Sequence, residues 1–132
     1  MPSIFTRIIN GEIPCHKIAE SENYLAFLDI NPLVKGHTLV IPKAEVDYIF
    51  DLDQETLSGL MLFSQKVAKG MKAAIACNRI GVTVIGLEVP HAHVHLVPIN
   101  TMDDMNFSKK KLTMTSESLA ETAGQINRFV QL

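Results

Sequence analysis

The sequence has few of the residues that mark disulfide-rich, zinc-binding or nucleic-acid-binding proteins. Its two cysteines, Cys15 and Cys77, are too few for a disulfide framework and form no C-x-x-C pair for zinc. Basic charge is not in excess either. The formal net charge is −2 and the pI is about 6.2, so a polyanion such as DNA is not an expected partner. No apolar run approaches the roughly 20 residues of a membrane span, and the first residues lack the basic-then-apolar pattern of a signal peptide. We therefore expect a cytoplasmic protein that binds neither nucleic acid nor membranes.

The hydrophobic pattern predicts one α+β domain over residues 1–132. With 47% hydrophobic and 20% charged residues, the chain has an ordinary globular composition, and its length suits a single core. Short turns between most of the strands favour a five-stranded antiparallel sheet. The polar stretch 100–111 is expected to be a loop whose three lysines, at 109–111, form a solvated turn. By periodicity and turn residues, the expected helices are a short N-terminal one from Ser3 to Asn10, a long one over 54–76 and a final one capped by Ser116, and the expected strands are 16–20, 24–30, 37–41, 81–89 and the run around 91–98.

Three of the five histidines, His91, His93 and His95, occupy alternate positions in an apolar, β-branched run bounded by prolines. Side chains alternate between the two faces of a strand, so a strand here would place all three imidazoles on one face. A structural core would have to supply each of these imidazoles with a buried hydrogen-bond partner. The run therefore predicts a functional site.

From the residues alone, the histidine run has two chemical interpretations. Alternate histidines on a strand can chelate a transition metal, and this is the favoured interpretation on spacing alone. They can also provide a nucleophile flanked by imidazoles that bind an anion. No carboxylate follows the run within residues 96–99 and no cysteine lies near it, which weakens the metal interpretation. Gly81 and Gly86 bracket a turn whose backbone N–H groups could approach a phosphate, which supports the anion interpretation.

Four blocks of the sequence resemble the histidine triad (HIT) superfamily. They are residues 4–14 (IFTRIINGEIP), 27–32 (FLDINP), 36–43 (GHTLVIPK) and the histidine run 91–98 (HAHVHLVP). Their order and spacing agree with the family over about residues 3–100, which leaves 101–132 as a C-terminal loop and helix. The match in four blocks is a much more specific signal than the histidine run alone.

The resemblance implies a role for individual residues. His93 would attack the α-phosphorus of a nucleotide and form a covalent nucleotidyl-histidine, with its ring held by the backbone carbonyl of His91. His95 would bind a phosphate oxygen, and His37 would support the triad. The implied nucleotide-binding residues are Asp29 for the ribose hydroxyls, Phe5, Ile8, Phe27 and Ile30 around the base, and Leu28, Gly86 and Glu88 beside them. No cofactor is expected. A homodimer is expected from the family likeness and from Leu62 and Phe63, which lie outside the main apolar stripe of the 54–76 helix.

The chain departs from the family just before the triad. Many relatives carry Gly-Gln-Ser or Gly-Gln-Thr and then Val, whereas this chain has Gly86, Leu87, Glu88 and Val89. Glu88 replaces a hydroxyl thought to assist the leaving group, so it is either a general acid near the phosphate or a surface carboxylate. The C-terminal tryptophan of the phosphoramidase branch is absent as well.

The expected function is a nucleotidyl hydrolase or transferase. Its substrate would be a purine nucleotide with a substituent on the α-phosphate, either a phosphoramidate or a dinucleoside polyphosphate. Two alternatives are a metal-binding protein that uses His91, His93 and His95, and a nucleotide-binding regulator without turnover.

Overall fold

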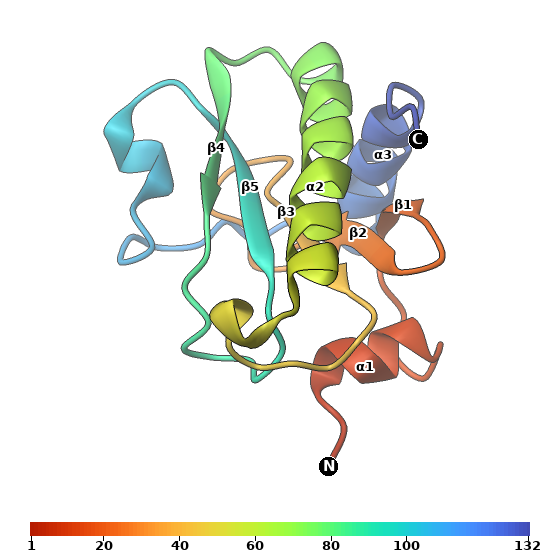
Figure 1. Ribbon diagram of the computed structural model, residues 1–132. Helices are drawn as coiled ribbons and strands as arrows, with labels where there is room; N and C mark the ends of the chain where they lie inside the picture. Colours follow the sequence, from red (N-terminus) through yellow and green to blue (C-terminus); the bar gives the residue numbers. More distant parts are fainter.

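A computed structural model of residues 1–132 shows an α+β domain with a five-stranded antiparallel sheet, as expected (Figure 1). The strand order is β1-β2-β3-β5-β4, so β1 and β4 form the two edges. No helix combines the length and the apolarity that a membrane crossing requires. In chain order the elements are α1 (Ile4–Ile9), β1 (Lys17–Glu20), β2 (Tyr24–Leu28), β3 (Thr38–Pro42), the 3-10 turn η1 (Ile49–Asp51), α2 (Gln54–Ala74), β4 (Arg79–Thr83), β5 (Val94–Ile99), η2 (Met102–Met105) and α3 (Ser116–Asn127).

The sheet has a different core on each face. On one face Val40, Val94 and Leu96 pack with residues of α2 and α3 in a cluster of 17 buried residues. On the other face a smaller cluster joins Phe5 of α1 to four alternate residues of β2 and β3: Leu25, Phe27, Leu39 and Ile41. Because alternate residues of a strand face opposite ways, His95 lies on the α1 side of the sheet, away from Val94 and Leu96. The functional site therefore lies on the face that α1 covers.

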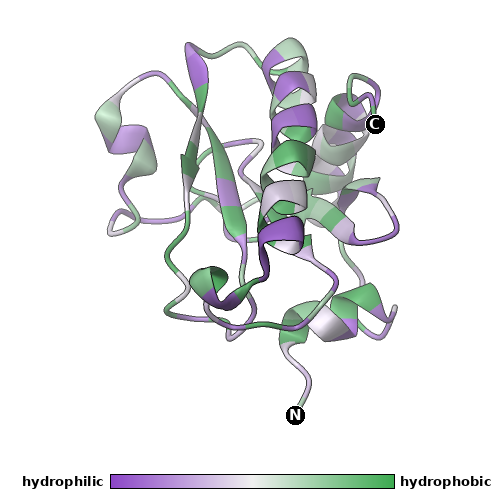
Figure 2. Cartoon of the chain, viewed as in Figure 1, coloured by the Kyte–Doolittle hydropathy of each residue, from purple (hydrophilic) through white to green (hydrophobic).

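The helices begin at capping residues that the sequence supplies. Ser3 and Asp53 accept hydrogen bonds from backbone N–H groups in the first turns of α1 and α2, and Thr115, one residue before the expected Ser116, does so for α3. Hydrophobic and hydrophilic residues alternate around α2 (Figure 2), as expected for a helix with one face on the sheet. Phe63 of α2 is buried in the core, so the prediction that it lies outside the apolar stripe is wrong, whereas Leu62 is 60% exposed.

The strand predicted to carry all three histidines is shorter than expected. β5 begins only at Val94, and β4 ends at Thr83 rather than continuing to 89, so His91 and His93 lie in an irregular segment before the strand. Pro90 cannot donate to a sheet ladder, and Gly86 turns the chain with a φ of +76°. In place of a ladder, the backbone N–H of Ala92 donates to the carbonyl of Val46, far away in sequence.

Candidate functional site

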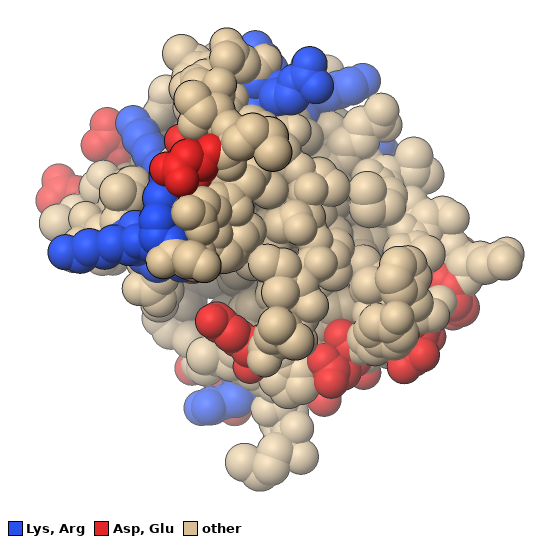
Figure 3. All heavy atoms as spheres, turned by 90° about the vertical axis from the view of Figure 1, so that its left-hand side faces the viewer, with Lys and Arg blue, Asp and Glu red and all other residues tan.

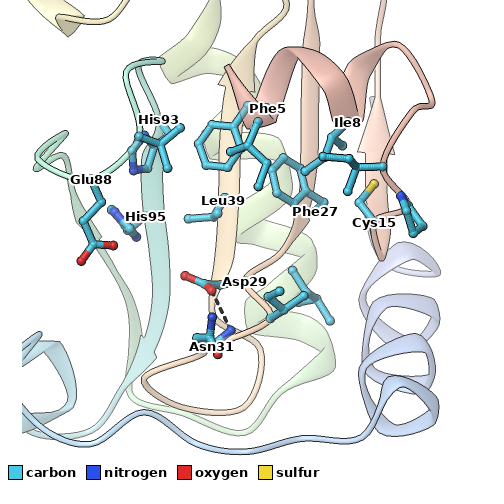
Figure 4. Close-up of a pocket in the computed structure, with 16 residues that line it drawn as sticks. Phe5, Ile8, Cys15, Phe27, Asp29, Asn31, Leu39, Glu88, His93 and His95 are labelled. Atoms are coloured by element: carbon cyan, nitrogen blue, oxygen red, sulfur yellow. Dashed lines mark hydrogen bonds between the residues drawn. The ribbon is translucent and has the colours of Figure 1, made fainter. Parts of the chain in front are cut away.

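Two cavities meet at His93 and His95 on the α1 side of the sheet. The first, which we call the apolar cavity, has a volume of about 270 Å³ and is lined mainly by hydrophobic residues of α1, the 13–15 turn and β2 (Figure 4). The second, the polar cavity, has a volume of about 310 Å³ and is bounded by residues 85–88 and by the segment after η2. The residues that line both cavities are Asp29, Asn31, Glu88, His93 and His95.

The apolar cavity holds the residues expected to surround a base. Phe5 packs edge-on against Phe27, with ring centroids 5.6 Å apart, and against His93, with centroids 5.1 Å apart. Ile8 lies one turn after Phe5 on α1 and lines the same cavity. Leu28 lines it as a buried residue, and Ile30 lines it although its side chain is 63% exposed. These walls fit a flat apolar group.

Asp29 lies where the two cavities join. Its Oδ1 accepts a hydrogen bond of 2.8 Å from the backbone N–H of Asn31 (Figure 4). Burial raises the pKa of the Asp29 carboxyl, and the hydrogen bond from Asn31 partly opposes that shift. Its second oxygen, Oδ2, makes no hydrogen bond within the chain and is free to accept from a ligand hydroxyl.

His93 is held in one tautomer by the backbone. Its Nδ1 lies 2.7 Å from the carbonyl oxygen of His91. A carbonyl only accepts, so Nδ1 carries the proton and donates it, and Nε2 keeps its lone pair. His93 lines both cavities, so this unprotonated nitrogen belongs to the surface on which a ligand would bind. It has the properties of a nucleophile.

His95 carries its proton on the other ring nitrogen from His93, because His37 orients its ring. The backbone N–H of Leu33 donates to Nδ1 of His37, over 3.1 Å, so His37 is protonated on Nε2. That Nε2 donates to Nδ1 of His95, over 2.9 Å, which leaves the proton of His95 on its own Nε2. Burial, followed by neighbouring histidines, lowers the pKa of His37 to about 3 and that of His95 to about 4. Both rings are therefore neutral at pH 7, and His95 offers an N–H donor.

The ring of His91 lies outside both cavities. Its Nε2 donates to the carbonyl of Pro42 over 2.8 Å, and its Nδ1 accepts from Ser3 Oγ at the same distance. The ring is fully buried, and burial lowers its pKa. No buried polar side-chain atom in the structure lacks a partner. Residues distant in sequence thus supply the hydrogen-bond partners of the His91 ring, whereas His93 and His95 each have one bonded ring nitrogen and line the cavities.

The structure places different residues together as potential metal ligands. Atoms of Asp29, His37 and His95 lie within 4.8 Å of one another, whereas the predicted set was the triad itself. His37 would have to bind through Nε2, which carries a proton because Leu33 N–H occupies Nδ1. His91 has both ring nitrogens engaged. Metal ligation needs an unprotonated nitrogen, so neither set fits a metal in this arrangement.

Glu88 and Gly86 lie on the boundary of the polar cavity. The Glu88 side chain is exposed to solvent and also borders the space in front of His93 and His95, so it faces the site (Figure 4). Gly86 lines the polar cavity and not the apolar one. An added Cβ at Gly86 would meet no atom within 4 Å, so its positive φ is the reason for glycine there.

Two site residues come from a segment that the sequence analysis treated as a loop. The ring of Phe107 packs edge-on against His95, with centroids 4.9 Å apart, and Lys111 lines the polar cavity beside it. The prediction of a solvated lysine turn is wrong for Lys111, which is partly buried, and for Lys109, which lies within 4 Å of both Asp103 and Asp104. The one available signal was an isolated aromatic residue in a polar stretch.

Comparisons with known proteins identify one family and related folds. The model of the HIT domain family matches residues 10–102. The adenosine 5'-monophosphoramidase hnt1 of Schizosaccharomyces pombe is 38% identical over 103 residues, which cover 74% of each chain. Among solved structures, a HIT-like protein of Bartonella henselae involved in cell-cycle regulation is 34% identical, with a TM-score of 0.83 over 96% of this chain and 95% of that one. A zinc-bound histidine triad protein of Mycobacterium smegmatis is 29% identical, with a TM-score of 0.77 over 95% of each chain.

Proposed function

The chain belongs to the HIT domain family, and we propose that it is a nucleotidyl hydrolase or transferase that cleaves an amine from the α-phosphate of a purine nucleotide. The observation that carries the proposal is the arrangement of His93. Its Nδ1 is tied to the carbonyl of His91, and its unprotonated Nε2 lies where an apolar and a polar cavity meet. A nucleoside would occupy the apolar cavity and the amine would extend into the polar one.

The reaction has two displacements at phosphorus. In the first, the lone pair of His93 Nε2 forms a bond to the α-phosphorus, the P–N bond to the amine breaks, and the departing nitrogen takes up the electron pair and a proton. In the second, water attacks the same phosphorus, the P–Nε2 bond breaks, and the products are the nucleoside monophosphate and neutral His93. A hydroxyl or amine acceptor in place of water would make the protein a transferase.

The other residues of the site stabilise this path. His95 would donate its Nε2–H to a phosphate oxygen as charge develops there, and the hydrogen bond from His37 keeps that proton in place. Asp29 would accept hydrogen bonds from the ribose hydroxyls. Glu88, when protonated, would supply the proton that the leaving nitrogen needs.

The decisive test is to trap the covalent intermediate. Wild-type protein quenched in acid-free denaturant during turnover of adenosine 5'-phosphoramidate should carry one added AMP by mass spectrometry, and peptide mapping should place it on His93. His93→Ala should show neither the adduct nor turnover, while a folded His93→Ala still binds AMP. Wild-type turnover by His93→Ala would refute the proposal. If the wild-type protein binds AMP but turns over no substrate, the result would instead support the alternative of a nucleotide-binding regulator without turnover.

Stoichiometric zinc would favour the metal-binding alternative, which the zinc-bound relative makes worth testing. Elemental analysis of protein purified without an affinity tag measures it directly. The protonated Nε2 of His37 and the engaged ring of His91 support the expectation that no metal is needed, and chelator treatment should leave turnover unchanged.

We propose that the protein acts as a homodimer through its β4 edge. A cavity of about 560 Å³ lies beside this edge, and ten of its twelve lining residues are hydrophobic. The exposed large hydrophobic residues on this surface include Tyr48, Phe50, Met61, Val82, Ile85 and Leu87. An exposed apolar surface next to a free strand edge fits a second copy of the chain. Light scattering at micromolar concentration should give twice the chain mass for the wild-type protein. Val82→Lys should reduce the measured mass to that of a single chain.

A further inference from the structure

The polar cavity has a wall that the proposed reaction does not use. Residues 100–111 leave the end of β5, pass through η2 and return beside the triad, and they bring Phe107 and Lys111 to the cavity. Figure 3 looks onto the side of the molecule that carries this segment, and it shows basic atoms on one side of a hollow and acidic atoms on the other. A leaving group would enter this hollow.

The ammonium of Lys111 is held in a fixed position. Its Nζ donates to the backbone carbonyl of Phe107 over 2.6 Å and lies 3.4 Å from that of Lys109. It also lies 5.8 Å from the centroid of the Phe107 ring, whose edge contacts His95. An ammonium has three N–H donors, so after two carbonyl contacts one donor stays available. The lysine is thereby positioned relative to the catalytic imidazoles through Phe107.

No carboxylate neutralises this ammonium. None of the ion pairs within 4.0 Å in the structure includes Lys111. The nearby Asp103 and Asp104 pair instead with Lys109. The charge is nevertheless directed at the site. Burial is the main influence that raises the pKa of Asp29, and the positive charge of Lys111 is one of those that lower it. The cavity is thus lined by a partly buried cation that contacts backbone carbonyls but no carboxylate.

Glu88 on the same cavity limits which anion can bind. A dianionic phosphate between Lys111 and Glu88 would be attracted by one charge and repelled by the other. A singly charged carboxylate is repelled less than a dianion, because the repulsion grows with the charge of the ligand. Glu88 is exposed and can keep its carboxylate in solvent, whereas Lys111 is tied to two carbonyls.

We propose that Lys111 is a specificity-determining residue that selects amine leaving groups carrying a carboxylate. The inference rests on the proposed function and adds the chemical class of the leaving group: a nucleotide α-phosphoramidate of an amino acid. The carboxylate binds the free N–H of Lys111 and stays chemically unchanged, while the nitrogen next to it departs from phosphorus with a proton. A fixed cation of this kind stabilises the charge of the leaving group with little reorganisation.

The test compares substrates that differ in one charge. Adenosine 5'-phosphoramidates of glycine and of glycinamide have nearly the same shape, but only the first carries a carboxylate. We expect kcat/KM of the wild-type protein to be about tenfold higher for glycine, the effect of one charge-assisted hydrogen bond. Lys111→Met should reduce this ratio to about one, and Lys111→Arg should keep at least half of it because the charge is retained.

Controls separate the possible failures. Lys110→Met removes an exposed neighbouring charge and should leave the ratio unchanged. A thermal melt checks that Lys111→Met is folded. If the wild-type protein turns over both substrates at equal rates, or if Lys111→Met keeps the preference for glycine, the specificity role is overturned while the proposed function stands. A third substrate, the adenosine 5'-phosphoramidate of aminomethylphosphonate, carries a phosphonate in place of the carboxylate of glycine. If the wild-type protein turns it over faster than the glycine substrate, the carboxylate assignment is overturned. If neither glycine nor glycinamide is released, the proposed function itself fails.

Discussion

The two cavities share His93 and His95 but are built from different parts of the chain. The apolar cavity is formed by α1, the 13–15 turn and β2, and its aromatic rings belong to a buried cluster of the sheet. The polar cavity is formed by the irregular residues 85–88 and by the segment that follows η2. Under the proposed function, nucleotide recognition would be part of the core, whereas leaving-group recognition would lie in segments that make few core contacts. Sequence changes in those segments can alter the leaving group without unfolding the domain.

The largest loss of activity should follow from disturbing the imidazoles that both cavities share, and His37 supports one of them. His37→Phe removes the donor that fixes the tautomer of His95, so the N–H that would bind the phosphate is no longer held in place. We expect kcat to fall about 10²-fold, and this factor should be the same for every leaving group. Steady-state kinetics on two substrates measures this, and His37→Gln, which keeps an N–H donor, should recover part of the loss. A loss confined to one leaving group would contradict a shared role.

A smaller effect is expected from the apolar cavity alone. Phe5→Ala removes a ring that packs against both Phe27 and His93, so KM should rise about 30-fold for all leaving groups, equivalent to about 2 kcal/mol of nucleotide binding. Because Phe5 is also buried, the variant should be less stable by about 3 kcal/mol in a denaturant titration. Phe129→Ala, at an exposed residue outside both cavities, is the control.

The polar cavity should respond in a way that depends on the leaving group. Glu88→Gln should slow the release of poorly leaving amines about tenfold and spare substrates with good leaving groups, because only the former need a proton. Equal rates for Glu88→Gln and wild type on both kinds of substrate would remove Glu88 from the mechanism, and Glu117→Gln on α3 serves as the matched control.

The smallest effect concerns the buried histidines and stability. His37, His91 and His95 have folded-state pKa values below that of a free imidazole, mainly because they are buried. Below about pH 6.5 the unfolded chain therefore binds more protons than the folded one, and the free energy of unfolding falls as pH drops towards 4. We expect His37 and His95 each to account for a loss of about 1 kcal/mol between pH 7 and pH 5.5 in urea titrations. The free energy of unfolding should depend less steeply on pH in His95→Gln than in the wild-type protein. An equally steep dependence in the variant would exclude a contribution from His95.

Local patterns predicted most of the fold and the apolar cavity. The four family blocks placed Phe5, Phe27, Asp29 and His93, and all of them lie at one site in the structure. Phe5 and Phe27 belong to α1 and β2, whose periodicity is visible in a single sequence, whereas Asp29 and His93 lie just outside β2 and β5. The predicted end of the long helix, residue 76, is two residues too late, because α2 ends at Ala74.

The remainder depended on contacts between distant residues. His91 and His93 do not join the strand because Ala92 bonds to Val46, and no local pattern reveals that pairing. Phe107 and Lys111 reach the site only because residues 100–111 fold back on the triad. The direction in which Glu88 faces also depended on the turn at Gly86. In each case a tertiary contact outweighed the local preference that the sequence displays.

Ser3 has two roles that link α1 to the nucleophile. Its Oγ caps α1 by accepting from the N–H of Thr6, and the same atom donates to His91, whose carbonyl orients His93. The helix that carries the aromatic wall and the loop that carries the attacking nitrogen are therefore joined through one hydroxyl. Fraying of the first turn of α1 would loosen both together, so the proposed function implies that nucleotide affinity and reactivity vary together at this end of the chain.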